Sequence, residues 1–193
     1  TVMPKMLDNG YRDITSSEKP ILKPEDLKNF KIRVPGNPLW VTLFKALGAA
    51  PTPINFGELY ASLQTRVVDG QENPLALIQS AKLYEVQKHV TLSNHIWDGH
   101  YIFANATRWK GMPDDVRKIL TEGLDAAVVK ERADIKAFNT TALDEMKKAG
   151  LTIDEIDTTS FREVLRTSGF YADWKQKFGT EAWSLLEKYV GQL

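Results

Sequence analysis

The sequence has 193 residues, of which 42% are hydrophobic and 26% are charged, as in an ordinary globular protein. Its 25 basic and 25 acidic side chains balance, and no basic block is present, which argues against a nucleic-acid partner. The absence of cysteine excludes disulfides, thiolate metal sites and thiol catalysis, and no apolar run approaches the ~20 residues that span a bilayer.

The first third of the chain predicts short strands that alternate with helices. Residues 31–34 are expected to form a strand, followed by a helix with Asn37 as its N-cap and Pro38 at its first position. This helix places apolar side chains on one face and ends at Gly48. The members of that face are Trp40, Leu43, Phe44 and Leu47.

The same alternation continues to residue 81. Extended segments are expected at residues 51–54 and 67–69, with a helix over residues 57–64 between them and a further helix that opens at Asn73 and Pro74. This order predicts an α/β fold with a mainly parallel sheet. Ligands of such sheets bind beyond the carboxyl ends of the strands, where Arg33, Phe56 and Asn73 are expected to lie.

The second half predicts fewer strands and one unusually long helix. Residues 89–92 and 101–105 are expected to be separate extended segments. A helix from Pro113 to Gly150 would measure about 50 Å, which favours a spine across two lobes over a coiled coil because its apolar stripe lacks heptads. A strand over residues 151–156 and two or three short helices follow.

No motif of an enzyme or of a metal site is present. Zincin, nucleophile-elbow, Walker and dinucleotide-binding motifs are absent. His89, His95 and His100 lack the carboxylate pattern of metal sites, and surface or interface positions explain His89 and His100. The sequence therefore predicts no enzymatic activity, no metal and no cofactor.

Arg33 is the first candidate for binding a ligand. It lies between apolar residues in a predicted strand, and a partly buried guanidinium needs an anionic partner such as a carboxylate. An internal salt bridge to an Asp or Glu explains the position equally well, so both alternatives stay open.

Weaker candidates each have a structural alternative. Arg12 could be an exposed surface arginine, and Phe56 and Trp97 could be core aromatics instead of groups that stack on a ligand. Asn73 is explained by helix capping, although a capping asparagine can also face a ligand.

Four ordered segments resemble the signature of the solute-binding proteins of TRAP transporters, the dicarboxylate-type extracytoplasmic receptors. The likeness extends through residues 84–88, residues 93–95 and the helix that follows Pro113, so it covers effectively the whole chain. The four segments are KIRVPGNP at residues 31–38, LGAAPTP at 47–53, FGELY at 56–60 and VDGQENP at 68–74.

The resemblance implies roles for individual residues. Arg33 matches the arginine that pairs with the substrate carboxylate, Arg12 matches a second arginine near the lobe crossover, and Phe56 and Asn73 match a pocket aromatic and a ligand-binding asparagine. Glu72 and His95 match positions near the hinge and the pocket floor that are linked to closure, and Asn37 and Trp40 lie where members of the family differ and would tune the choice of ligand. Trp97 is expected to bind the ligand as a stacking aromatic, independently of the resemblance.

The resemblance also implies a two-lobed periplasmic binding protein whose first lobe is incomplete in this chain, since members of the family carry a substantial segment ahead of Arg12. The expected parts are an incoming strand (1–11), the second lobe with the ligand-binding wall (12–88), crossover strands (89–112), the long spine helix (113–149) and a C-terminal strand with helices (150–193).

The implied function is secondary transport. The protein would capture an organic acid anion in the periplasm and deliver it to a TRAP membrane permease, without being embedded in the membrane itself. A carboxylate-sensing receptor for a signalling partner and a structural or interaction domain without a ligand remain the alternatives.

Overall fold

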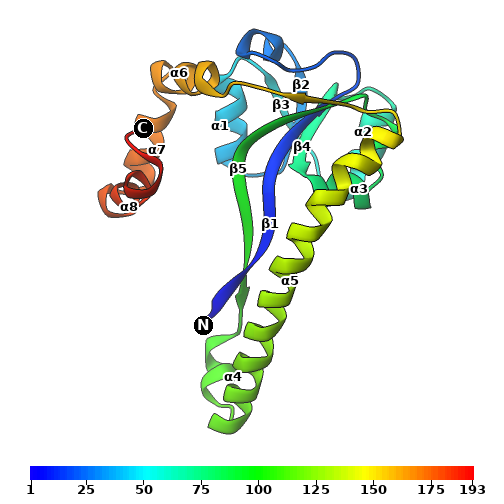
Figure 1. Ribbon diagram of the computed structural model, residues 1–193. Helices are drawn as coiled ribbons and strands as arrows, with labels where there is room; N and C mark the ends of the chain where they lie inside the picture. Colours follow the sequence, from blue (N-terminus) through cyan, green and yellow to red (C-terminus); the bar gives the residue numbers. More distant parts are fainter. The chain divides into compact units, whose positions relative to one another are not determined.

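The computed structural model describes all 193 residues, from Thr1 to Leu193, as six strands, eight α-helices and three short 3-10 helices (Figure 1). The elements in chain order are β1 (Val2–Ser16), η1 (Pro24–Leu27), β2 (Lys31–Val34), α1 (Pro38–Ala46), β3 (Ala50–Pro53), η2 (Phe56–Glu58), α2 (Leu59–Gln64), β4 (Gly70–Pro74), α3 (Leu75–Ser80), η3 (Leu83–Glu85), β5 (His89–Phe103), α4 (Ala106–Lys110), α5 (Asp114–Lys148), β6 (Thr152–Glu155), α6 (Thr159–Thr167), α7 (Phe170–Phe178) and α8 (Thr180–Val190).

The strands follow the order β3-β2-β4-β1-β5-β6 in one sheet, which confirms the predicted α/β class. The chain forms two compact units, and it passes between them within β1, β4 and β5. Unit 1 contains Thr1–Asp13, Asn73–Glu85 and Asn94–Leu151. Unit 2 contains Ile14–Glu72, Val86–Ser93 and Thr152–Leu193.

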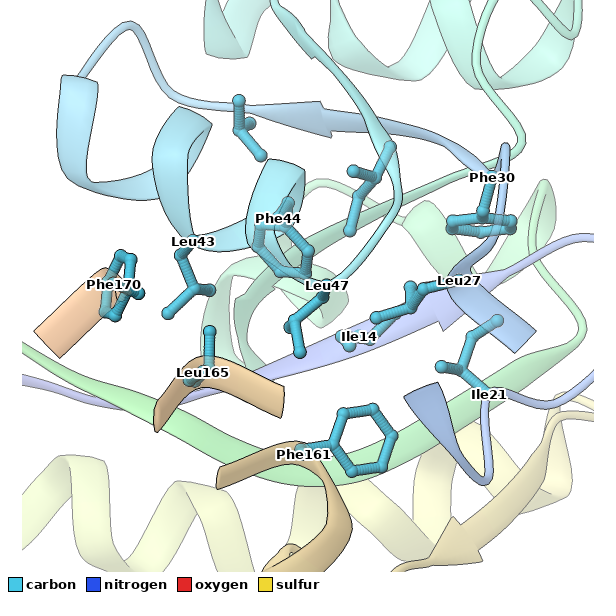
Figure 2. Close-up of a cluster of buried hydrophobic side chains, with 12 residues drawn as sticks. Ile14, Ile21, Leu27, Phe30, Leu43, Phe44, Leu47, Phe161, Leu165 and Phe170 are labelled. Carbon is cyan, nitrogen blue, oxygen red and sulfur yellow. The ribbon is translucent and has the colours of Figure 1, made fainter. Parts of the chain in front are cut away.

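Unit 2 has a hydrophobic core between its sheet and its helices. The predicted helix after residue 37 is confirmed: the side chain of Asn37 accepts a hydrogen bond from the backbone N–H of Leu39 at 2.9 Å, and Pro38 begins α1. Its apolar face is buried against residues of β1, β2, α6 and α7 (Figure 2). The core residues are Ile14, Ile21, Leu27, Phe30, Ile32, Val34, Leu43, Phe44, Leu47, Phe161, Leu165 and Phe170.

Among the glycines of unit 2, Gly70 lies closest to neighbouring parts of the chain. A Cβ atom at this position would lie only 2.5 Å from the ring of Phe30 and even closer to the backbone oxygen of Thr15. Only glycine therefore allows β4 to begin directly beside β1 and the core.

Unit 1 is built from the first part of β1, the second part of β5, and helices α3 to α5. The long helix is confirmed, with acidic Asp114 and Asp115 in its first turn and Lys147 and Lys148 in its last, so that each charge is opposite in sign to the end of the helix dipole it lies near. All of α5 belongs to unit 1, and α3 packs against it. None of the helices combines the length and the apolar character that a membrane span requires.

Two strand predictions were wrong. The third strand is β4, Gly70–Pro74, instead of residues 67–69, where Val67 is 58% exposed in a turn. The two segments expected at residues 89–92 and 101–105 form the single strand β5. The polar stretch between them lacks the alternation typical of strands, and pairing with β1 in the sheet overrides this local signal.

Candidate ligand-binding site

Arg33 is held in a defined orientation inside unit 2. It lies next to the last residue of β2, in parallel register with Thr52 of β3 and Gln71 of β4. Its side chain is buried, with the residue only 3% exposed, and its Nε donates a hydrogen bond to the backbone oxygen of Ile54 at 2.8 Å. The position at the carboxyl end of a parallel strand is the one that the sequence predicted.

The aromatic ring of Phe56 lies beside this guanidinium group. The Cζ atom of Arg33 is 6.0 Å from the ring centroid, which is within range of a cation–π interaction. Phe56 begins η2 and is 42% exposed, so it is not a core aromatic. Unit 2 thus brings together two of the residues predicted to bind a ligand.

Trp40 and Glu72 form a second predicted pair in unit 2. The indole Nε1 of Trp40, on α1, donates a hydrogen bond to Oε2 of Glu72 at 3.1 Å. Glu72 is completely buried, so this donor helps to replace the water that a carboxylate loses on burial. Asn37 is exposed, and its side chain caps α1.

Arg12 and Asn73 meet inside unit 1, where Asp98 joins them. Arg12 is 4% exposed, so it is not a surface residue, and its Nη1 contacts Oδ2 of Asp98 at 2.7 Å. Its Nη2 donates to Oδ1 of Asn73 at 2.9 Å. The N-cap explanation of Asn73 was wrong, because the N-cap of α3 is Pro74 and the side chain of Asn73 is used by Arg12.

Trp97 lies on β5 in unit 1 and is 44% exposed, so it is not a core aromatic either. Its Nε1 donates to Oδ1 of Asp8 at 3.0 Å, and the same oxygen accepts the backbone N–H of Gly10 at 2.8 Å. The role of Trp97 toward a ligand stays a prediction.

The two residues expected at the hinge lie at points where the chain changes units. Glu72 is the last residue of its segment in unit 2, and His95 follows the passage from Ser93 to Asn94 in β5 by one residue. Asn94 has a positive φ of 44°, and its backbone N–H is bonded to Oδ1 of Asp13 at 3.0 Å. These positions support the hinge prediction without testing it.

The histidines do not form a metal centre. His89 contacts Asp154 across the β5–β6 pair at 3.2 Å, and His100 is exposed. No group of three or more histidine, aspartate or glutamate side chains is arranged to hold a metal ion.

Two features of these regions were missed by sequence reasoning. One is Asp98, whose partnership with Arg12 depends on how β1 lies beside β5. The other is a chain of buried hydrogen bonds in unit 2, in which Gln71 Nε2 donates to Thr15 Oγ1 at 3.0 Å and that hydroxyl donates to Gln87 Oε1 at 2.8 Å. None of the three polar residues in this chain of hydrogen bonds lies in a strand that the sequence predicted, so no local signal indicated their burial.

Comparison with known proteins gives a consistent result. Residues 3–173 match the family described as bacterial extracellular solute-binding protein, family 7. The chain is 34% identical over 159 residues to the 2,3-diketo-L-gulonate-binding periplasmic protein of Escherichia coli, covering 82% of the chain and 48% of that relative. It is 37% identical over 169 residues to the C4-dicarboxylate-binding periplasmic protein of Rhodobacter capsulatus, covering 88% and 48%.

A solved structure supports the same relationship. A TRAP periplasmic solute-binding protein from Polaromonas, bound to D-erythronate, is similar with a TM-score of 0.85 and 31% identity, covering 91% of this chain and 58% of that one. The chain spans about half the length of the curated relatives that it matches. On this match of residues 3–173, the chain belongs to the bacterial extracellular solute-binding proteins of family 7, the family of the TRAP-transporter receptors.

Proposed function

We propose that this chain is part of a periplasmic solute-binding protein that captures an organic acid anion and delivers it to a TRAP membrane permease. The observation that carries the proposal is the buried guanidinium group of Arg33, oriented by the Ile54 carbonyl and by the Phe56 ring at the carboxyl end of β2. The relatives named for 2,3-diketo-L-gulonate and C4-dicarboxylates, and the structure with D-erythronate, make an acid the expected ligand class.

The geometry around Arg33 suits a carboxylate. With Nε directed at Ile54, the Nη1 and Nη2 edge is the part of the guanidinium that would face a ligand. Two parallel N–H donors on this edge match the two oxygens of a carboxylate, and a hydrogen bond to a charged group contributes about 1.5 to 3 kcal/mol. Arg33 would therefore orient the ligand and discriminate against neutral analogues.

Phe56 in unit 2 and Asn73 in unit 1 are further residues that we propose contact the acid. Phe56 is partly exposed beside the guanidinium, so its ring can cover the carbon skeleton of a bound acid. Within unit 1, Oδ1 of Asn73 accepts from Arg12, and because a carboxylate only accepts hydrogen bonds, Asn73 would contact an acid through its amide N–H groups. The sequence left open whether the oxygen or the nitrogen of the Asn73 amide would contact a ligand, and this assignment names the nitrogen.

A ligand screen tests the proposal directly. The complete protein that contains this chain is heated with succinate, D-erythronate or D-glucuronate, and with the neutral polyols erythritol and glucose. A ligand at 100 times its Kd stabilises the folded state by about 2.7 kcal/mol, so a true ligand raises the Tm. Stabilisation by an acid and not by a polyol is expected, whereas no stabilisation by any acid would indicate a structural domain.

A matched pair of variants assigns the contact to Arg33. Replacing Arg33 with alanine should weaken binding of the acid found in the screen by roughly tenfold or more, since the charged hydrogen bonds are lost. Arg66→Ala is the control, because Arg66 is an exposed arginine of unit 2 that pairs with Glu18. Unchanged affinity in Arg33→Ala, measured by calorimetry, would refute the assignment.

A further inference from the structure

Asp98 is the acidic residue of unit 1 that is connected through Arg12 to Asn73. Its Oδ2 atom accepts hydrogen bonds from Nη1 of Arg12 at 2.7 Å and from Nδ2 of Asn9 at 2.9 Å. The side chain of Asp98 is 20% exposed and that of Arg12 is 5% exposed. The two side chains therefore form a largely buried ion pair, whose charges cancel at short range.

Both terminal nitrogens of Arg12 have partners within unit 1. Nη1 contacts Asp98, and Nη2 donates to Oδ1 of Asn73 at 2.9 Å. Arg12 is also the only buried cation of unit 1, where the other buried charged residue is the acid Asp13. Unit 1 therefore offers an acid the neutral N–H groups of Asn73, beside a guanidinium whose charge Asp98 already balances.

This charge balance limits the number of carboxylates that a ligand can carry. In the proposed function, on which this inference rests, Arg33 supplies the positive charge for the first carboxylate. A second carboxylate near Asn73 would have to leave water, and a neutral ion pair cannot offset that cost. A hydroxyl group at the same place is uncharged, and its oxygen accepts from the Asn73 amide.

We infer that the ligand is a hydroxylated monocarboxylate of the aldonate type, and that Asp98 excludes dicarboxylates by neutralising Arg12. Ligands that share one carboxylate can be separated only by what the protein offers to the rest of the molecule. Asp98 is thus a residue that determines specificity, in addition to its part in holding Arg12 beside Asn73.

Pairs of acids that differ in one group test the inference. D-Erythronate and meso-tartrate share a carbon chain and the arrangement of its central hydroxyls, but the terminal CH2OH of the first is a carboxylate in the second. D-Gluconate and D-glucarate form a longer pair of the same kind. Calorimetry on the complete protein that contains this chain should show binding of at least one of the two monocarboxylates, at least about tenfold tighter than its dicarboxylate partner.

The outcomes separate this inference from the proposed function. Equal or tighter binding of the dicarboxylate, or no binding of either D-erythronate or D-gluconate, would overturn the inference. The proposed function would survive both results as long as another acid such as succinate binds. It would fail only if no acid binds.

Asp98→Asn assigns the preference to the carboxylate of Asp98. The substitution keeps an oxygen that can accept from Arg12 but removes the negative charge, so the affinity ratio of monocarboxylate to dicarboxylate should fall roughly tenfold. A purely structural defect would weaken both acids together and leave the ratio unchanged. Asp98→Glu keeps the charge and should keep the preference.

Asp125→Asn is the matched control, because it removes the same charge from unit 1 at a carboxylate that is 28% exposed and lies 3.8 Å from Lys5. Its affinity ratio should equal that of the wild-type protein. An unchanged ratio in Asp98→Asn, or an equal fall in Asp125→Asn, would overturn the role of Asp98. The comparison of the paired acids in the wild-type protein needs no variant, so it tests the inference even if Asp98→Asn does not fold.

Discussion

The two buried arginines that were predicted to bind a ligand, one in each unit, are accommodated in different ways. Arg12 in unit 1 forms an ion pair with Asp98 at 2.7 Å and also bonds the amide oxygen of Asn73. Arg33 in unit 2 is oriented by the carbonyl oxygen of Ile54 and by the face of the Phe56 ring. The carboxylate of Asp98 balances the charge of Arg12, and the carbonyl and the ring fix the direction of the Arg33 guanidinium group.

This difference suggests a division of roles. The Arg12–Asp98 pair connects β1 with β5 and fixes Asn73, which makes Arg12 primarily a structural and positioning residue. Arg33, at the carboxyl end of β2, is the residue that we propose recognises the anion. Arg12 was also predicted to bind the ligand, and the following experiments separate the two roles.

The largest expected effect comes from removing Asp98. Asp98→Ala leaves the buried charge of Arg12 without this carboxylate and should lower the free energy of unfolding by about 3 kcal/mol. Denaturant unfolding measures the change, with Asp125→Ala as control, because the more exposed Lys5–Asp125 pair of unit 1 should contribute less than about 1 kcal/mol.

A double replacement sharpens this result. In Arg12→Met with Asp98→Leu, both charges are removed together, and most of the lost stability should return. If the double variant is as unstable as Asp98→Ala, charge balance is not the reason for the pairing. If the double variant keeps its affinity for the ligand, Arg12 is not required for binding the acid.

The buried carboxyl group of Glu72 in unit 2 provides the next experiment. Trp40→Phe removes the indole donor from the completely buried Glu72, which should lower the stability by about 2 kcal/mol. Trp174→Phe is a matched control, because Trp174 Nε1 donates to the neutral hydroxyl of Thr42 at 3.0 Å, and a neutral acceptor is less costly to leave unpaired. Equal losses in the two variants would show that the charge of Glu72 does not matter for this bond.

The sequence predicted the local parts of these regions well. The cap at Asn37, the strand at residues 31–34 and the long helix after Pro113 follow from patterns a few residues long, and all three were confirmed. The position of Arg33 at a strand end also followed from pattern alone, and the family resemblance then implied a carboxylate as its partner.

The errors share a physical cause. β5 continues through its polar middle segment, and β4 begins at Gly70, because neighbouring strands pair with them over long sequence separations. Asp98 was missed for the same reason, since 86 residues separate it from Arg12. Long-range register is set by packing of the whole sheet and leaves little trace in any short window of sequence.

The role of the planar guanidinium group of Arg33 is tested by a conservative substitution. Arg33→Lys keeps the positive charge but loses the planar group that bonds Ile54 and lies beside Phe56, so ligand affinity should fall roughly tenfold. Calorimetry measures the affinity, and circular dichroism verifies the fold. Arg66→Lys should have no effect, and full retention of affinity in Arg33→Lys would show that charge alone is recognised.

The smallest expected effect concerns Phe56. Phe56→Leu keeps an apolar side chain but removes the aromatic face, and a cation–π interaction at a partly exposed site contributes about 0.5 to 1 kcal/mol. Affinity for the acid should therefore fall only two- to fivefold, by calorimetry, in a protein of nearly unchanged Tm. In the Arg33→Lys background the same replacement should cost less, because the guanidinium that the ring positions is already gone. Equal losses in both backgrounds would mean that Phe56 contacts the ligand on its own account instead of orienting Arg33.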